Sequence, residues 1–253
     1  MKLRHIISTS QFDRKTLEEL FVLSEKMEKL HKSRKSSKIL AGKIMVTLFY
    51  EPSTRTRLSF ETAMLKLGGA VISTENAAQF SSAIKGETIE DTIKVVNGYA
   101  DVIVLRHHED DSAERAAAVS VAPLINAGSG KKEHPTQGLL DLYTIQNELG
   151  TNEGLHFALM GDLKHSRVIH EQIRLLTLFK GNRMTLVSPK SLALPEEYKD
   201  IMKKRKVAFQ ETEKLSDVIS TIDVLSVNRV QKERLPPNIV YDEIKNLFII
   251  DKK

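Results

Sequence analysis

The sequence predicts an α/β protein built from two parallel-sheet domains. Short apolar runs of strand length alternate with longer segments of helical pattern, which is typical of βαβ units. This alternation stops near residue 150 and then starts again, which indicates one domain at residues 1–150 and a second at 151–253. A chain of 253 residues with 41% hydrophobic residues is large enough to bury a substantial core in each half.

In the first half, residues 43–50 are almost continuously apolar, as expected for a strand buried on both faces of a parallel sheet. The helical pattern after this strand ends at Gly68-Gly69, a typical C-terminal stop. The last helix begins with Pro135 and is followed by Gly150. The predicted elements of this half are helices at 13–30, 54–67, 88–99, 113–119 and 135–149, and strands at 43–50, 70–73, 101–105 and 122–126.

The second half repeats the same alternation on a shorter length. Its apolar runs are again bounded by turn residues or by amphipathic segments. The predicted strands are 155–160, 183–187, 207–210 and 223–227, with a further apolar run at 247–250, and the predicted helices are 165–179, 196–204 and 215–221.

The composition excludes several classes of protein. The chain has no cysteine, which excludes disulfides, thiolate zinc sites and a thiol nucleophile. No apolar run approaches the roughly 18 residues that a membrane span needs. Because residues 1–10 lack the apolar region of a secretory signal, we expect a cytoplasmic protein without a membrane partner.

The net charge of +5 and the pI near 9.2 favour an anionic partner. Nucleic acid is not expected, because the densest basic stretch, residues 26–38, has no interleaved aromatic residues and is typical of a solvated helix end. A small anionic metabolite fits the charge equally well.

No cofactor or metal is predicted. No G-x-G-x-x-G follows a strand, and the segment Gly128-Ser129-Gly130-Lys131 lacks the first glycine and the Ser/Thr of a P-loop. The adjacent residues His107 and His108 cannot easily share one ion with good geometry.

Polar side chains follow the first predicted strand, where parallel sheets bind their ligands. This segment, residues 51–57, places three hydroxyls and two guanidiniums at the first turn of a helix, whose free backbone N–H groups attract anions. Hydroxyl donors and arginine forks would add charge-assisted bonds to a phosphate. An ordinary Ser/Thr cap with surface arginines is the alternative, and the whole cluster favours phosphate. The residues are Ser53, Thr54, Arg55, Thr56 and Arg57.

Further candidates lie at other strand ends. Arg106 directly follows the predicted strand 101–105, and His134 and Gln137 lie three residues apart at the start of a helix, where both could point at one carbonyl. Arg167 is just inside a helix start, and Arg229 and Gln231 follow the strand 223–227. Two arginines suit a substrate with two carboxylates, since each fork binds one carboxylate bidentately.

These motifs resemble those of the aspartate/ornithine carbamoyltransferase family over essentially the whole chain. The matching segments are Ser-Thr-Arg-Thr-Arg at 53–57, Lys85-Gly86-Glu87, Arg106, His134-Pro135-Thr136-Gln137 and Arg229-Val230-Gln231. Ornithine enzymes usually carry Ser-Met-Arg-Thr-Arg and lack Arg-Val-Gln. Thr54 and Gln231 therefore favour the catalytic chain of the aspartate branch.

The resemblance implies a transferase that makes N-carbamoyl-L-aspartate from carbamoyl phosphate and L-aspartate for pyrimidine synthesis, without a cofactor. The active site is expected in the crevice between the two domains. Ser53, Thr54, Arg55 and Thr56 would hold the phosphate. Arg106 would bridge phosphate and carbonyl, and Thr56, Arg106 and His134 would polarise the carbonyl. Gln137 would orient the carbamoyl amine, and Arg167, Arg229 and Gln231 would clamp the aspartate carboxylates.

The resemblance also implies a homotrimer with shared active sites. In this family Ser81 and Lys85 reach into the site of a neighbouring subunit, and a regulatory chain is a possible further partner. Family chains continue beyond residue 253 into a His-Pro-Leu-Pro-Arg segment and a terminal helix, so the second domain is expected to be incomplete relative to the family. Ser129 and Ser166 stand where the family usually has an acidic residue and a glycine.

Two other functions remain open. A non-catalytic or fragmentary relative could bind carbamoyl phosphate or a partner chain without turnover. A related transferase could act on another amine, which Arg229 and Gln231 argue against.

Overall fold

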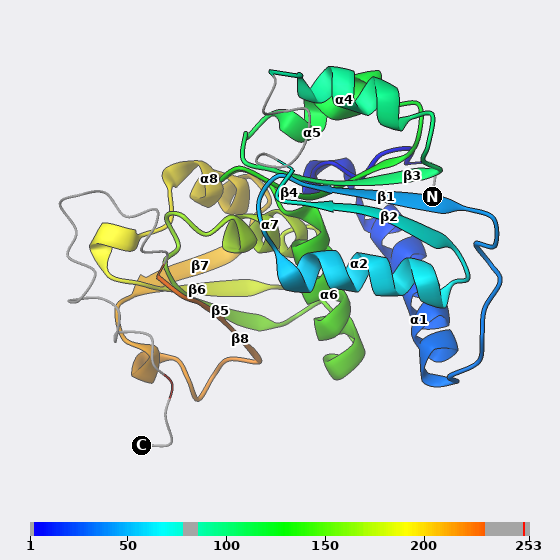
Figure 1. Cartoon of the computed structure of the whole chain (residues 1–253). Helices are drawn as coiled ribbons and strands as arrows, with labels where there is room; N and C mark the ends of the chain where they lie inside the picture. Colours follow the sequence, from blue (N-terminus) through cyan, green and yellow to red (C-terminus); the bar gives the residue numbers. More distant parts are fainter. Residues whose placement is uncertain (1–2, 78–85, 231–249, 251–253) are drawn as a thin grey trace. The chain divides into compact units, whose positions relative to one another are not determined.

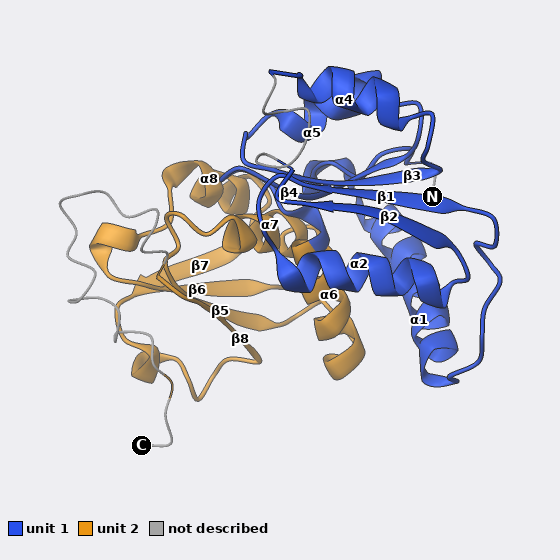
Figure 2. Ribbon diagram, in the orientation of Figure 1, with its two compact units in different colours: residues 1–136 blue, residues 137–253 orange. Residues whose placement is uncertain are grey.

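The structure, a computed structural model, describes residues 3–77, 86–230 and 250 (Figure 1). The chain divides into two compact units, Met1–Thr136 and Gln137–Lys253 (Figure 2). This division falls at the start of the long helix α6, whereas the sequence places the domain boundary after that helix, at residue 150.

Unit 1 is built on a four-stranded parallel sheet with the strand order β2-β1-β3-β4. The chain passes from β1 to β2 on one side and then returns to β3 on the other side. The strand order therefore reverses between β1 and β3, and sheets of this kind bind ligands beyond the carboxyl ends of the strands at that point. The strands are β1 (Ile44–Phe49), β2 (Ala70–Glu75), β3 (Val102–His107) and β4 (Leu124–Ser129).

Helices cover both faces of this sheet, as the continuous apolar strands predict. Successive residues of a strand point to opposite faces. Val46 and Leu48 pack with Ile93 of α4, whereas Met45 and Phe49 pack with Met64 of α2. Figure 1 shows α4 and α5 on one side of the sheet and α2 on the other. In the described part of unit 1 the helices are η1 (Thr9–Gln11), α1 (Arg14–Lys32), α2 (Thr54–Lys66), α4 (Ile89–Val96) and α5 (Ser112–Val119).

Unit 2 contains a second four-stranded parallel sheet, with the order β7-β6-β5-β8. Here the order reverses between β5 and β8, so the same rule marks the carboxyl ends of these two strands. All six residues of β5 are buried. The strands are β5 (His156–Gly161), β6 (Arg183–Val187), β7 (Ala208–Thr212) and β8 (Val224–Asn228), and the helices are α6 (Pro135–Leu149), α7 (Arg167–Leu176), η3 (Lys190–Leu192), α8 (Glu196–Lys204) and η4 (Leu215–Asp217).

The predicted fold class, two parallel-sheet α/β domains, is confirmed. Two local predictions differ from the structure, and a third falls almost entirely outside the described residues. Strand β3 includes Arg106, which the sequence placed just after the strand. The helix predicted at 215–221 is a single 3₁₀ turn, η4. The apolar run 247–250 lies outside the described residues except for Ile250, which is irregular. Within the described ranges, no helix is long and apolar enough to cross a membrane.

Candidate active site

The turn between β1 and α2 leaves the start of the helix open. Ser53 occupies the N-cap position, but it makes no side-chain capping bond with any described residue. Its hydroxyl instead donates to Thr56 Oγ1 at 2.9 Å. Thr54 and Arg55 are exposed. The first backbone N–H groups of a helix need acceptors, and an anion at this turn would supply them.

Arg106 brings a guanidinium from β3 to the same edge of the sheet. It is paired with Phe49 of β1, and its carbonyl accepts from the N–H of Tyr50 at 2.8 Å. Its Nη2 lies 3.2 Å from Glu51 Oε2, and its Nη1 donates to the carbonyl of Ala127 at 3.1 Å. The Glu51 carboxylate and the Ala127 carbonyl thus orient this guanidinium beside the segment that leads into α2.

Arg57 is bound to residues of β2, whereas Arg55 is exposed. The sequence placed both guanidiniums at the phosphate turn. Arg57 Nη2 forms an ion pair with Glu75 Oε2 at 2.8 Å, and its Nη1 donates to Ser73 Oγ at 3.2 Å. Both partners belong to β2, so Arg57 ties α2 to the edge of the sheet. Arg55 is the exposed guanidinium of this turn.

A hydrogen-bonded turn at the end of β4 holds His134. The N–H of Ser129 donates to the carbonyl of Glu133 at 3.0 Å, and the buried Ser129 hydroxyl accepts from Asn126 Nδ2 at 3.0 Å. His134 itself is partly buried, and its Nδ1 lies 3.5 Å from Thr136 Oγ1. The hydroxyl of Ser129, which stands where the family usually has an acidic residue, is therefore part of the local fold.

Gln137 is the first residue of unit 2 and lies in the first turn of α6, which begins at Pro135. Its Nε2 donates to Asp141 Oδ1 at 2.8 Å, one helical turn further along. The carboxyl of Asp141 also accepts from Gln172 Nε2 of α7 at 2.7 Å. Burial raises the pKa of Asp141, and the two amide donors oppose that rise. Sequence reasoning missed Asp141, although its spacing of four residues from Gln137 was a usable signal.

The carboxyl ends of β5 and β8 bring Arg167 and Arg229 to one edge of the second sheet. Arg167 is the first residue of α7 and is buried. Arg229 directly follows β8 and is exposed. The two strand ends lie so close that a Cβ at Gly161, where φ is +119°, would come within 1.9 Å of the Asn228 carbonyl oxygen. A residue with a side chain could not occupy this position without moving the strands apart.

Ser166 connects these two strand ends. Its hydroxyl accepts from the N–H of Ile169 at 3.3 Å, which caps α7, and donates to Asn228 Oδ1 at 2.8 Å. The hydroxyl at this position, where the family usually has glycine, thus fixes the helix start that presents Arg167. Three predicted site residues, Ser81, Lys85 and Gln231, lie outside the described residues.

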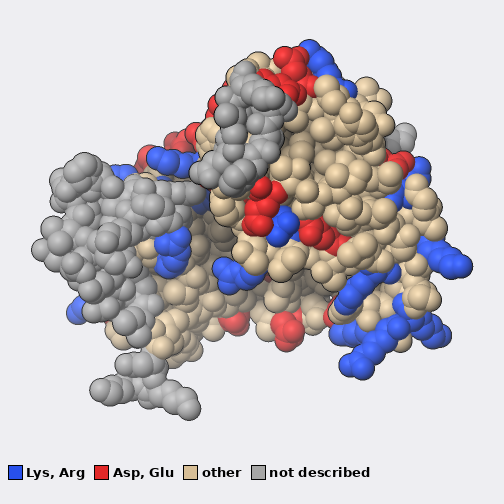
Figure 3. Space-filling view, in the orientation of Figure 1, with Lys and Arg blue, Asp and Glu red and all other residues tan. Residues whose placement is uncertain are grey.

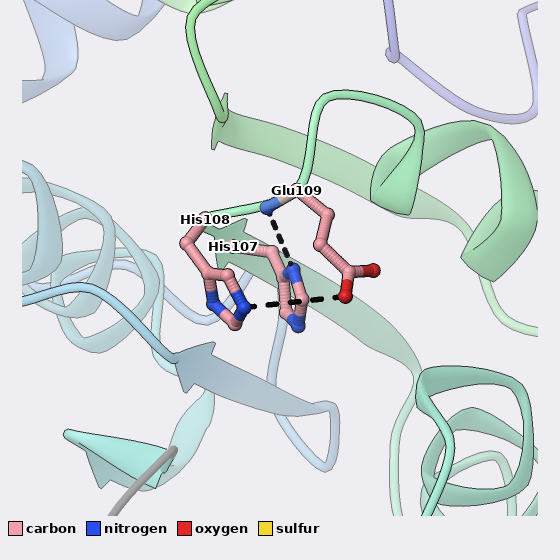
Figure 4. Close-up of side chains that lie close together, drawn as sticks. All are labelled: His107, His108 and Glu109. Carbon is pink, nitrogen blue, oxygen red and sulfur yellow. Dashed lines mark hydrogen bonds and ion pairs between the residues drawn. The ribbon is translucent and has the colours of Figure 1, made fainter.

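His107, His108 and Glu109 form a cluster with possible metal ligands within 4.8 Å of one another (Figure 4). The two rings stack with centroids 4.3 Å apart and an interplanar angle of 21°, so their in-plane lone pairs do not converge. The Glu109 N–H donates to His107 Nδ1 at 3.1 Å. In a neutral ring the proton is then on Nε2, and burial lowers the pKa of His107 to about 4. This donor set does not fit a cation.

The basic segment at residues 26–38 has the features of a solvated helix end. Figure 3 shows Lys and Arg side chains gathered at the lower right, over the end of α1 and the loop after it. Within α1, Glu25 pairs with Lys29 and Glu28 pairs with Lys32, both at a spacing of four residues. Such pairs neutralise part of the positive charge on an exposed helix.

Family models match both halves of the chain. The model described as "Aspartate/ornithine carbamoyltransferase, carbamoyl-P binding domain" matches residues 4–147, and the one described as "Aspartate/ornithine carbamoyltransferase, Asp/Orn binding domain" matches 153–253. The chain belongs to the aspartate/ornithine carbamoyltransferase family. The predicted resemblance is confirmed.

Curated relatives from the aspartate branch are similar along nearly the whole chain. The chloroplastic aspartate carbamoyltransferase of Arabidopsis thaliana is 47% identical over 252 residues, which are 99% of this chain and 65% of that protein. The aspartate carbamoyltransferase catalytic subunit of Methanocaldococcus jannaschii is 46% identical over 251 residues, 99% of this chain and 82% of that protein. The chain therefore spans just under two thirds of the Arabidopsis protein's length.

Solved structures of the family share the fold. The catalytic subunit of the M. jannaschii enzyme superimposes with a TM-score of 0.90 at 46% identity, covering 96% of this chain and 79% of that one. The Trypanosoma cruzi enzyme in complex with aspartate and phosphate superimposes with a TM-score of 0.84 at 39% identity, covering 91% and 75%.

Proposed function

We propose that this chain transfers the carbamoyl group of carbamoyl phosphate to the amine of L-aspartate, giving N-carbamoyl-L-aspartate and phosphate in pyrimidine synthesis. The observation that carries the proposal is the open start of α2 beyond β1, beside Arg106 of β3, at the point where the strand order reverses. A dianionic phosphate group is the kind of ligand that this combination of N–H groups, hydroxyls and guanidiniums attracts.

The phosphate is bound by the turn at residues 53–57. The backbone N–H groups at the start of α2 and the hydroxyls of Ser53, Thr54 and Thr56 donate to its oxygens. Arg55, which is exposed and close to these donors in sequence, supplies a positive charge. The positive end of the helix dipole adds to this attraction.

The carbonyl of carbamoyl phosphate is polarised by Thr56, Arg106 and His134. As aspartate attacks, negative charge develops on the carbonyl oxygen, and donors already directed at that position stabilise it without reorganising. Removal of one such donor typically costs about 3–4 kcal/mol in the transition state. The two bonds that Arg106 makes to Glu51 and Ala127 support this role, because they restrict its orientation.

The second substrate is bound in unit 2. Arg167 begins the helix that follows β5, and Arg229 directly follows the adjacent strand β8, so each can hold one carboxylate of aspartate through its planar fork. Gln231 completes this set in the proposal.

The reaction needs no nucleophilic side chain. The aspartate amine attacks the carbonyl carbon and forms a C–N bond, and the C–O bond to phosphate then breaks. The amine loses one proton, which the departing phosphate accepts. The protein binds both substrates at reacting distance and stabilises the charge that develops on the carbonyl oxygen.

We further propose that the active chain is a cytoplasmic homotrimer in which Ser81 and Lys85 complete the site of a neighbouring subunit. The support for the assembly is the family to which the chain belongs. A regulatory chain is a possible further partner. Sedimentation equilibrium of the purified chain tests the assembly, since a monomeric chain at assay concentration would contradict shared sites.

The function is tested by measuring carbamoyl-aspartate formation from carbamoyl phosphate and L-aspartate, with L-ornithine as the control amine. Product with aspartate and none with ornithine is the expected result. Product with ornithine at a comparable rate would favour a transferase for another amine. Carbamoyl phosphate binding in calorimetry without any product would favour the non-catalytic alternative.

A further inference from the structure

Asp141 lies at the centre of a hydrogen-bond chain that joins three elements of unit 2. Its Oδ1 accepts from Gln137 Nε2 of α6 at 2.8 Å, and its Oδ2 accepts from Gln172 Nε2 of α7 at 2.7 Å. At its far end, Gln172 Oε1 accepts from Ser226 Oγ of β8 at 2.9 Å. These two hydrogen bonds hold both ends of the Gln172 amide, which is buried.

This arrangement determines which end of the Gln137 amide faces a ligand. An ionised carboxylate can only accept hydrogen bonds, so the NH₂ end of Gln137 must turn toward Asp141. The carbonyl oxygen, Oε1, is then the end that a ligand can reach. An amide whose orientation is set by a fixed partner does not need to be ordered again when the ligand binds.

The carbamoyl group of the proposed substrate needs an acceptor at this position. Its NH₂ group is a hydrogen-bond donor, and a Gln137 amide rotated by half a turn would oppose it with a second donor. The two amide orientations are nearly equal in shape, and only their hydrogen-bond partners distinguish them.

We propose that Asp141 is a positioning residue for carbamoyl transfer, which holds the Gln137 side chain with Oε1 directed at the carbamoyl amine. The inference rests on the proposed function. Gln172 donates to the other oxygen of Asp141, so its hydrogen bond is separate from the one that orients Gln137.

A purely structural role of Asp141 would have different effects on the variants from the proposed positioning role. If Asp141 only held α6 against α7, the loss of either of its partners would have similar effects, and binding of every ligand would weaken together. If it positions Gln137, the loss is confined to steps that involve the carbamoyl amine and passes through Gln137 alone.

The test is a double-mutant cycle of Asp141→Ala and Gln137→Ala, with Gln172→Met as the matched control. We expect each single variant of the cycle to lower kcat about tenfold, the effect of one lost hydrogen bond. In the Gln137→Ala background, Asp141→Ala should cause no further loss. Gln172→Met removes the other amide of the same carboxyl and should keep kcat within about twofold.

A second readout uses N-(phosphonacetyl)-L-aspartic acid, which is bound in one of the T. cruzi structures. This compound has no group in the place of the carbamoyl amine, so its affinity should be the same in Asp141→Ala and the unmodified chain. If Asp141→Ala does not fold, as judged by circular dichroism, Asp141→Leu replaces it, because leucine fills the space without an acceptor.

The possible results distinguish a failure of the positioning role of Asp141 from a failure of the proposed function. Losses that add in the double variant, or a parallel loss of affinity for the phosphonate compound, would overturn the positioning role while the function stands. An equal loss of kcat in Gln172→Met would do the same. An unmodified chain that makes no carbamoyl-aspartate would overturn the proposed function and this inference with it.

Discussion

The two units differ at the start of one equivalent helix, the helix that follows the central strand β1 or β5 of each sheet. In unit 1 the chain leaves β1 and begins α2 at Ser53, whose hydroxyl does not cap the helix within the described residues. In unit 2 it leaves β5 and begins α7 at Ser166, whose hydroxyl does. Both serines occupy the N-cap position, yet only one of them satisfies the backbone of its helix.

The two helices also differ in burial. Eight of the ten residues of α7 are buried, whereas among the thirteen residues of α2 only Met64 is. The open and exposed start of α2 suits a proposed ligand with many acceptor oxygens, for which backbone N–H groups are good partners. The closed start of α7 suits a ligand bound by one arginine side chain held in a rigid frame. The same topology thus accommodates both of the anion sites that we propose.

The difference in burial between α7 and α2 predicts the largest effect of a substitution on stability. Ile173→Ala in α7 should lower the free energy of unfolding by about 3 kcal/mol, because a fully buried side chain leaves a cavity. Leu58→Ala in α2, where the side chain is half exposed, should change it by less than about 0.5 kcal/mol. Urea denaturation followed by circular dichroism measures the free energy of unfolding of both variants. Equal losses would show that the two helices contribute equally to stability.

The proposed phosphate site predicts the next effect. Arg55→Ala should weaken carbamoyl phosphate binding about 10- to 100-fold, the effect of losing a charged hydrogen-bond partner, with little loss of stability. Arg14→Ala on α1 is the matched control, since its exposed guanidinium pairs with Glu18 away from this turn. Isothermal titration calorimetry gives both affinities. Unchanged binding in Arg55→Ala would contradict the role of the 53–57 turn.

A feature that the two units share predicts the pH dependence. Burial lowers the pKa of His107 in unit 1 and of His170 in unit 2 to about 4, against 6.5 for an unfolded chain. The folded state therefore prefers the neutral rings. Their contribution is complete above pH 6.5 and is lost as the pH falls from 6.5 toward 4, where the unfolded chain binds more protons.

Denaturation at pH 7 and pH 5.5 should show a loss of about 1 kcal/mol for each ring. His170→Gln keeps a donor for the Leu163 carbonyl, which the ring now contacts at 2.9 Å, but it does not titrate. This variant should lose less stability between the two pH values than the unmodified chain. An identical pH dependence would mean that His170 is not held neutral by the fold.

The two N-cap serines predict the smallest effect. Ser166→Ala should cost about 1 kcal/mol, since it removes the cap of α7. Ser53→Ala should leave stability almost unchanged, because that hydroxyl bonds to Thr56 Oγ1 and not to the helix backbone. Thermal unfolding of the two variants gives this difference directly. A larger loss for Ser53→Ala would reverse the comparison between the units.

Much of the fold followed from patterns within short segments of the chain. Continuous apolar runs marked β1 and β5, and a proline and a glycine marked both ends of α6, whose predicted bounds match the structure. The turn at 53–57 was recognisable because its hydroxyls and arginines are adjacent in sequence. The helix predicted at 215–221 was wrong beyond its first turn, since a short apolar segment can pack without completing a helix.

The contacts that define the candidate site join distant parts of the chain, and only the tertiary structure decided them. The crossover from β2 back to β3 places Arg106 beside Glu51, and the approach of β5 to β8 brings Ser166 to Asn228 across 62 residues. Asp141 meets Gln172 across 31 residues because α6 and α7 lie together. Periodicity and turn chemistry act over a few residues, whereas these contacts depend on the order of strands and the packing of helices. A sequence therefore indicates which groups are available, and the fold determines which of them meet.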